Sequence, residues 1–109
     1  MNELAAKKCL PCEGGVAPLD AKTAQAMLAK LKGWSLEGDR LVKAFPFPNY
    51  HHTMAFVNAL AWISHREDHH PQLVVGYNHC RVEYWTHAIG GLSENDFICA
   101  AKCVALFEL

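Results

Sequence analysis

The sequence lacks the features that mark nucleic-acid-binding, secreted and membrane-spanning proteins. Its formal net charge is −1, so no excess of basic side chains is available to neutralise a phosphate backbone, and direct nucleic-acid binding is not expected. It has no apolar run of about 18 residues, the length of a transmembrane helix, and its N-terminus has no signal-peptide pattern. We therefore expect a cytoplasmic protein without membrane contact.

Cysteine is present in an odd number, five, without the secretory pattern that favours disulfides, so we interpret these residues as reduced thiols. Cys9-x-x-Cys12 could supply half of a zinc site, but a closed structural site needs four ligands and no second Cys-x-x-Cys follows. Cys99 and Cys103 are spaced to share one helix face and are expected in the core. We favour a cysteine-bearing tail over a metal site.

The length of 109 residues suits one domain with a modest hydrophobic core. Residues 1–18 have little helical or strand periodicity and are expected to form an N-terminal arm. Residues 19–109 then form the single domain.

The domain has an alternating pattern of helices and strand pairs. Apolar periodicity, caps and turn residues predict a helix from an Asp20 cap to Gly33, a hairpin over 34–47 turning at Gly38-Asp39, a helix from Tyr50 to about Asp68, a hairpin over 73–86 turning at Asn78-His79, and a helix capped by Ser93. Pro46 and Pro48 place the second strand at an edge or near its end. This order predicts an α+β fold, a four-stranded, mainly antiparallel sheet with three helices packed on one face.

The last strand predicts which face of the sheet stays open. Cys80, Val82, Tyr84 and Thr86 point to one side, and Arg81, Glu83, Trp85 and His87 point to the other. Because the second set is largely polar, that face is not expected to be core. A second copy of the chain could cover the exposed edges, so we expect a homo-oligomer.

Three histidines dominate the candidate site. Pro71 disfavours helix for the residue before it, so a helix must end near His69 and leave His70 extended. His87 returns to the same region at the far end of the second hairpin. Imidazole titrates near neutrality, so one ring can donate a proton while another accepts one. His69 is expected in the last helical turn, where the helix dipole favours a cation.

Two further possibilities concern Asp96 and a metal ion. Asp96 occupies the capping-box position three residues after Ser93 and could also orient a histidine. His65 and His69 are four residues apart, a spacing that suits two zinc ligands, but Glu67 is not where the His-Glu-x-x-His motif requires it. A metal site remains the minority hypothesis, and we expect neither metal nor cofactor.

The motifs HHP and THAIGGLSENDFICAA resemble those of the pterin-4a-carbinolamine dehydratases, also called the dimerisation cofactor family. The opening KKCLPCEGGVAPL and the GW before the first strand resemble its bacterial branch. The resemblance covers nearly the whole chain. It implies the α+β fold, a homodimer or homotetramer, and cofactor-free dehydration of 4a-hydroxytetrahydropterin to quinonoid dihydropterin.

The resemblance also implies which residues act. His69, His70 and His87 match the family's active-site histidines, and Asp96 matches its acidic partner. Many members have a glutamate four residues before the first histidine, where this chain has His65. The implied substrate is released by aromatic amino-acid hydroxylases such as phenylalanine hydroxylase, which would be a functional rather than a physical partner.

Residues beyond the motif add hypotheses on binding. Trp85 or Phe47 could stack on the pterin ring, and His70 could bind and position it. Two alternatives to the enzyme stay open. One is a protein-interaction module, since the family includes members that stabilise a transcription factor dimer. The other is a metal-binding protein, with Cys9, Cys12, His65 and His69 as ligands.

Overall fold

The computed structural model describes residues 3–11 and 17–109. Their elements are η1 (Glu3–Ala6), α1 (Ala21–Leu28), β1 (Ser35–Glu37), β2 (Arg40–Pro46), α2 (Tyr50–Glu67), β3 (Gln72–Val75), β4 (His79–Tyr84), η2 (His87–Ile89) and α3 (Glu94–Phe107), where η marks a 3-10 helix. The predicted alternation of helices and hairpins is confirmed. None of the helices in the described ranges has both the length and the apolar character needed to cross a membrane.

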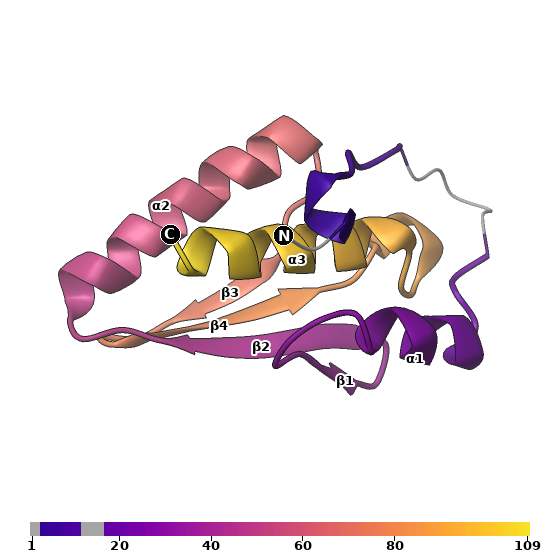
Figure 1. The fold of residues 1–109 in the computed structure, drawn as a ribbon, viewed down its shortest axis with the longest axis horizontal. Coiled ribbons are helices and arrows are strands. Elements are labelled where there is room, and N and C mark those ends of the chain that lie inside the picture. The colour runs from indigo at the N-terminus through magenta and orange to yellow at the C-terminus, as the bar shows by residue number, and fades with distance from the viewer. Residues whose placement is uncertain (1–2, 12–16) are drawn as a thin grey trace.

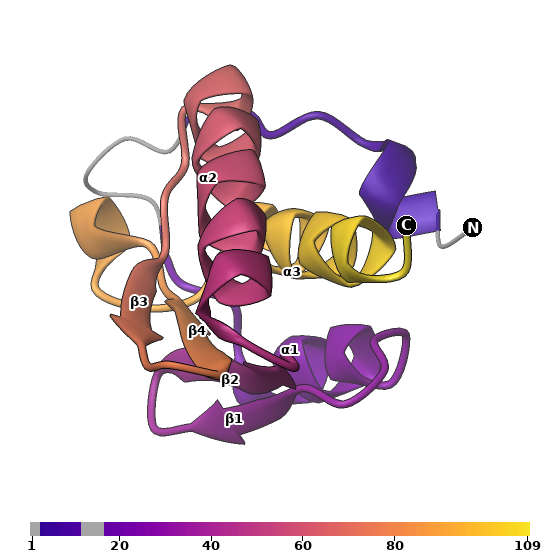
Figure 2. The same ribbon diagram turned by 90° about the vertical axis from the view of Figure 1, so that its left-hand side faces the viewer.

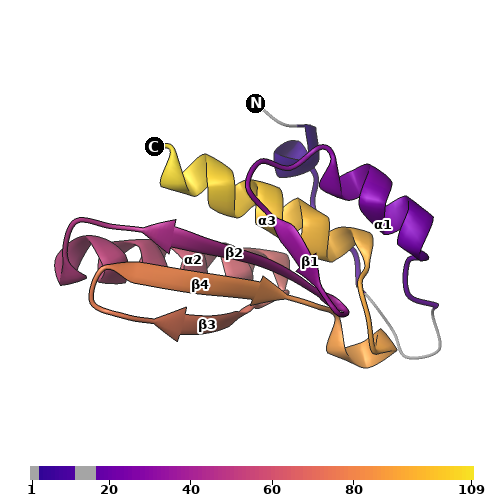
Figure 3. The same ribbon diagram turned by 90° about the horizontal axis from the view of Figure 1, so that it is seen from below.

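The four strands form one antiparallel sheet in the order β1-β2-β4-β3. Helices α2 and α3 lie over one face of this sheet, and α1 inserts Ala24 into the same core (Figures 1 and 2). Seen from below, the strands lie in front of α2 and α3, and no described helix covers this second face (Figure 3). The predicted α+β class is therefore confirmed.

Strand β4 has the predicted division between its two faces. Cys80, Val82 and Tyr84 are fully buried under the helices. On the other face, the Glu83 carboxylate accepts hydrogen bonds from Arg40 at 2.7 Å and from Arg81 at 3.1 Å. These ion pairs cover an outward-facing carboxylate, so Glu83 is only 8% exposed although it is not part of the apolar core.

The first helix is shorter than expected. The Asp20 cap is confirmed, since its side chain accepts from the Thr23 N–H at 2.8 Å. The helix ends at Leu28, however, because the next turns are tightened by bonds from Lys30 N to Met27 O and from Leu31 N to Leu28 O. These bonds span three residues rather than four, as in a 3-10 turn.

The end of α2 corrects the expected position of His69. Asp68 adopts the left-handed conformation with φ of 51°, so the helix closes before His69 instead of including it. The His69 N–H then bonds the Ser64 carbonyl at 3.1 Å, and the Asp68 N–H bonds that of His65 at 3.3 Å. This is a Schellman-type end, usually made with glycine. His69 thus lies just beyond the helix rather than in its last turn.

The second hairpin is shifted slightly from its expected bounds. Val75 pairs with Cys80, and Gly76 N–H bonds His79 O at 2.9 Å, so Tyr77 and Asn78 form the turn rather than Asn78 and His79. The first hairpin turns at Gly38-Asp39 as predicted, since Glu37 pairs with Arg40.

The double glycine returns the chain from β4 to α3. Thr86 and Gly91 form an isolated antiparallel bridge that closes the short loop containing η2. Gly90 has φ of +67°, which a side chain would strain, and a Cβ on Gly91 would lie 2.8 Å from the Pro18 side chain. His87 is therefore presented at the start of a compact loop instead of continuing the strand.

Candidate active site

Asp96 lies at the centre of the site and is completely buried. It belongs to the predicted capping box, in which its Oδ2 accepts from the Ser93 N–H at 2.9 Å. The same oxygen accepts from the Thr86 hydroxyl at 2.9 Å, and Oδ1 lies 2.6 Å from His69 Nε2. A capping residue needs only the first of these contacts, so Asp96 also links α3 to the end of β4 and to His69.

His69 is held on two sides. Its Nε2 bonds Asp96, and its ring stacks on the buried Tyr84 ring at a centroid distance of 5.9 Å and an angle of 8°. Because a carboxylate only accepts hydrogen bonds, Nε2 must carry a proton. Nδ1 is then the ring nitrogen that can exchange a proton with a bound ligand.

Tyr84 supports the ring of His69 without competing as an acid. Burial raises the pKa of its hydroxyl well above the usual range, and the neighbouring Cys103 and Cys99 thiols add to the shift. The hydroxyl lies 3.5 Å from Cys103 Sγ. Tyr84 therefore stays neutral throughout the range in which imidazoles titrate.

His70 and His87 form the exposed part of the site. Their ring centroids are 6.3 Å apart and their planes nearly parallel, with an angle of 24°. His70 follows His69 directly and precedes Pro71, whereas His87 comes from the loop after β4. The structure thus brings together all three predicted histidines.

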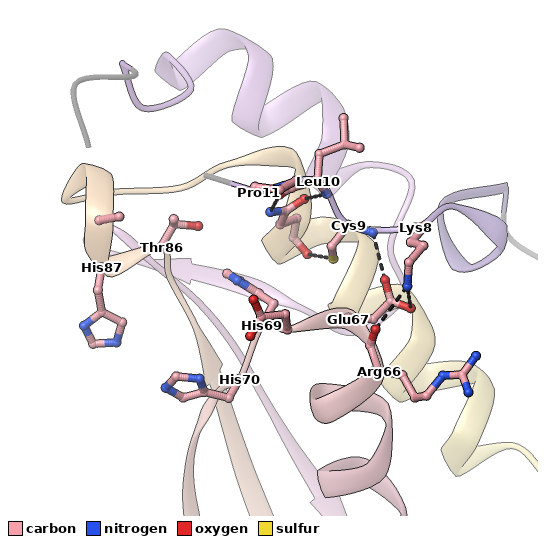
Figure 4. A pocket seen from close by; sticks show the side chains of 13 residues that line it. Lys8, Cys9, Leu10, Pro11, Arg66, Glu67, His69, His70, Thr86 and His87 are labelled. Carbon is pink, nitrogen blue, oxygen red and sulfur yellow. Dashed lines mark hydrogen bonds and ion pairs between the residues drawn. The ribbon is translucent and has the colours of Figure 1, made fainter. Parts of the chain in front are cut away.

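A cavity of about 450 Å³ joins these side chains (Figure 4). His69, His70, Thr86 and His87 line one part of it, and the residues of the N-terminal arm, Lys8 to Pro11, line another. The remaining lining residues are Arg66, Glu67, Asp68, Ala88 and Asn95. The volume lies in the range of small-molecule sites.

The two aromatic residues predicted to stack on a ligand lie in different places. Trp85 is next to the site, with its ring centroid 4.3 Å from that of His87, while Arg40 covers it at 3.9 Å. Phe47 follows the far end of β2 and packs against Phe56 and Phe107. The structure does not bring Phe47 to the histidines, because the strand runs away from them.

Three contributors were not predicted from the sequence. The Thr86 hydroxyl bonds Asp96, and the side chains of Glu67 and Asn95 bond the N-terminal arm. Thr86 directly precedes His87 in the Thr-His motif, and this motif is the sequence signal that could have indicated the role of Thr86. No local pattern indicates the other two, since each depends on a segment far away in the sequence.

The proposed metal ligands do not come together in the described residues. Cys9 is buried with its Sγ 3.5 Å from Cys99 Sγ, His69 is bonded to Asp96, and His65 is exposed beside Trp62. Cys12 lies outside the described residues. Within 3–11 and 17–109, no group of three or more His, Cys, Asp or Glu side chains could hold a metal ion.

Cysteines 80, 99 and 103 are fully buried, so the expectation that Cys99 and Cys103 lie in the core is confirmed.

His65 lines a second cavity of about 400 Å³, which it shares with His69 and His70. His69 and His70 therefore line both of these cavities, whereas His87 lines only the first.

The fold and the site define an α+β protein with a histidine-lined pocket suited to proton transfer. Residues 17–106 match the model of the family described as pterin 4 alpha carbinolamine dehydratase. The chain belongs to this family, as its HHP and THAIGGLSEND motifs predict.

Bacterial relatives agree with the family match. A protein from Dechloromonas aromatica (strain RCB) is 62% identical over 97% of this chain and 95% of its own. Another from Nitrosomonas europaea is 61% identical, over 97% of this chain and 95% of its own. Each bears pterin-4-alpha-carbinolamine dehydratase as a provisional name. These likenesses confirm the predicted bacterial branch.

Two solved structures are similar in fold. A transcriptional coactivator/pterin dehydratase from Brucella melitensis superposes with a TM-score of 0.78 at 27% identity, covering 82% of this chain and 97% of its own. A pterin dehydratase-like protein described as a RuBisCO assembly factor in the alpha-carboxysome has a TM-score of 0.60 at 30% identity, covering 70% and 90%. The fold therefore occurs in proteins described with different roles.

Proposed function

We propose that this protein dehydrates 4a-hydroxytetrahydropterin to quinonoid dihydropterin and water by general acid–base catalysis. The observation that carries the proposal is the convergence of three imidazoles on one cavity, with one of them anchored to a buried carboxylate. This arrangement supplies proton donors and acceptors on a rigid support. Membership of the family supplies the substrate class.

The reaction needs two proton transfers. A proton must reach the 4a-hydroxyl as it departs as water, and another must leave the ring N5. One imidazole in the protonated state and one in the neutral state can perform these steps together. Nδ1 of His69 and the ring of His87 are the proposed groups, and His70 binds and positions the pterin. Trp85, in contact with His87, is the proposed stacking residue.

The proposed context is the recycling of tetrahydropterin. An aromatic amino-acid hydroxylase, such as phenylalanine hydroxylase, releases the carbinolamine after each turnover, and this protein would return it to the cycle in the cytoplasm.

We expect purified protein to accelerate the dehydration of freshly generated 4a-hydroxytetrahydropterin, and to do so equally after treatment with a chelator. The physical reason is that imidazole groups suffice for both proton transfers. The assay measures the rate above spontaneous dehydration, with the metal content checked by elemental analysis. Loss of turnover on chelation, restored by added zinc, would contradict the imidazole mechanism; no acceleration by untreated protein would contradict the function itself.

An interaction role is the second candidate. The Brucella melitensis neighbour is named a coactivator as well as a pterin dehydratase, and the carboxysome neighbour is described as an assembly factor. A protein of this type would bind a macromolecular partner without needing turnover. Absence of turnover in the dehydratase assay would favour this candidate, whereas turnover would support the enzyme.

We also expect a homodimer or homotetramer in solution. Strand β3 is at the edge of the sheet, and Val74 and Val75 on it are 47% and 41% exposed. Tyr77 in the adjoining turn is 66% exposed. An open edge with apolar side chains favours pairing with another chain. Sedimentation equilibrium at micromolar concentration should show a dimer or tetramer, and a stable monomer would refute this prediction.

A further inference from the structure

The N-terminal arm reaches the cavity that contains the histidines. Lys8, Cys9, Leu10 and Pro11 line it, although they lie far from the histidines in sequence. In Figure 4 the arm passes on the side of the cavity away from His87. The arm is therefore placed to contact one side of a ligand, while the imidazoles contact the other side.

Asn95 holds the arm through both polar atoms of its side-chain amide, the oxygen and the nitrogen. Its Oδ1 accepts from Leu10 N–H at 3.0 Å, and its Nδ2 donates to the Leu10 carbonyl. The side chain thus bonds the arm as a neighbouring strand would, through one donor and one acceptor. Asn95 is only 6% exposed, and a residue without a terminal amide could not make both bonds.

Glu67 provides a second anchor one residue earlier along the arm. Its Oε1 accepts from Cys9 N–H at 2.8 Å, and its Oε2 lies 3.9 Å from Lys102 Nζ and 4.0 Å from Lys8 Nζ. Burial opposes ionisation of this carboxyl, but the Cys9 N–H and the two lysines outweigh it and lower its pKa. A charged carboxylate therefore faces the arm at neutral pH.

The Cys9 side chain completes the attachment. Its Sγ lies 3.7 Å from the Asn95 carbonyl oxygen and 3.5 Å from Cys99 Sγ. The thiol is therefore directed into the core, and Cys9 is only 9% exposed. With the two polar anchors, this fixes Cys9 and Leu10 in position.

Both anchors adjoin residues of the site itself. Glu67 precedes His69 by two residues, and Asn95 is next to Asp96. We propose that residues 8–11 form a wall of the pterin pocket, and that Glu67 and Asn95 are positioning residues that set the distance of this wall from the imidazoles. This assignment rests on the proposed function, because it takes the ligand to be a pterin.

The variants Asn95→Ala and Glu67→Ala test the assignment through separate anchors, so either decides if the other does not fold. Each is expected to raise KM for the carbinolamine by about 3- to 10-fold with kcat little changed, the factor given by losing one or two hydrogen bonds of ordinary net strength. The dissociation constant of 7,8-dihydrobiopterin, followed by tryptophan fluorescence, should rise by the same factor.

Asn49→Ala is the matched control. Asn49 caps the start of α2 by accepting from His52 N–H at 3.0 Å, at the opposite end of the helix from Glu67. Its replacement should lower the melting temperature and leave KM unchanged. A KM increase equal to that of Asn95→Ala would show general loosening and overturn the proposal, as would wild-type KM and pterin affinity in both arm variants.

The two readouts also separate this proposal from the function on which it rests. Wild-type protein that binds 7,8-dihydrobiopterin but does not turn over carbinolamine would refute the dehydratase function alone. In that case, weaker pterin binding by the arm variants would still support the wall. Wild-type protein that binds no pterin would refute both.

Discussion

Replacing His69 with alanine is expected to lower the kcat of carbinolamine dehydration by about 10²- to 10⁴-fold, the usual contribution of general acid–base catalysis. With Nε2 bonded to Asp96 at 2.6 Å, Nδ1 is the proposed donor to the departing hydroxyl. His87→Ala should reduce kcat within the same range, because His87 is proposed to take part in the proton transfer at N5. Initial rates, corrected for spontaneous dehydration, measure both effects.

The three histidines should differ in the parameter that changes. His69→Ala and His87→Ala should each remove one limb of the pH profile, whereas His70→Ala should mainly raise KM, because it removes a binding contact. His51→Ala is the control, since His51 is exposed in the first turn of α2, at the end remote from the site. Should His70→Ala leave KM unchanged and lower kcat as much as the others, this division of roles is wrong.

Replacing Asp96 with asparagine is expected to reduce kcat by about 10²- to 10⁴-fold, because it removes the carboxylate that stabilises the doubly protonated ring of His69. Asparagine can keep its oxygen towards Ser93 N–H and the Thr86 hydroxyl, which turns its NH₂ towards His69. The N–H at Nε2 then has no acceptor, so the doubly protonated ring, the form in which His69 donates from Nδ1, is no longer stabilised. A comparable carboxylate-to-amide change costs about 10⁴-fold in a serine protease triad.

The stability of the Asp96→Asn variant should change far less than its activity. Asparagine has nearly the same size and is a good acceptor at a helix start, so the loss of unfolding free energy should not exceed roughly 2 kcal/mol. Ser93→Ala is the matched comparison, because it removes a hydroxyl 2.7 Å from Thr86 Oγ1 without touching His69. It should lower the melting temperature and keep kcat. Lost stability with intact turnover in Asp96→Asn would remove Asp96 from the catalytic site.

His69 lies outside α2, whereas the sequence predicted it within the last helical turn. A proline after His70 correctly predicts a helix end in this region. It does not determine which residue takes the closing left-handed conformation, and here it is Asp68 with φ of 51°. His69 thereby leaves the helix. Its main electrostatic partner is the carboxylate of Asp96 rather than the end of the helix dipole.

Phe47 and Trp85 show the same distinction for binding residues. Both are aromatic and close to the predicted strands, so the sequence treats them as equivalent candidates. The register of β2 against β4 pairs Leu41 with Tyr84 and Pro46 with His79, and this places Phe47 at the opposite end of the strand from His87. The structure therefore leaves Trp85 as the aromatic candidate near the histidines.

The sequence by itself determined the α+β order, the caps at Asp20 and Ser93, the two faces of β4 and the family. The first three depend on local backbone preferences and on residues a few positions apart. The family depends on motifs that can be read directly in the sequence. Only the tertiary structure decided the bond between His69 and Asp96, 27 residues apart, and the bonds of Cys9 to Glu67 and Leu10 to Asn95, separated by 58 and 85 residues. Such contacts form where packed helices and strands bring distant segments together. No local sequence pattern indicates which distant segments will become neighbours.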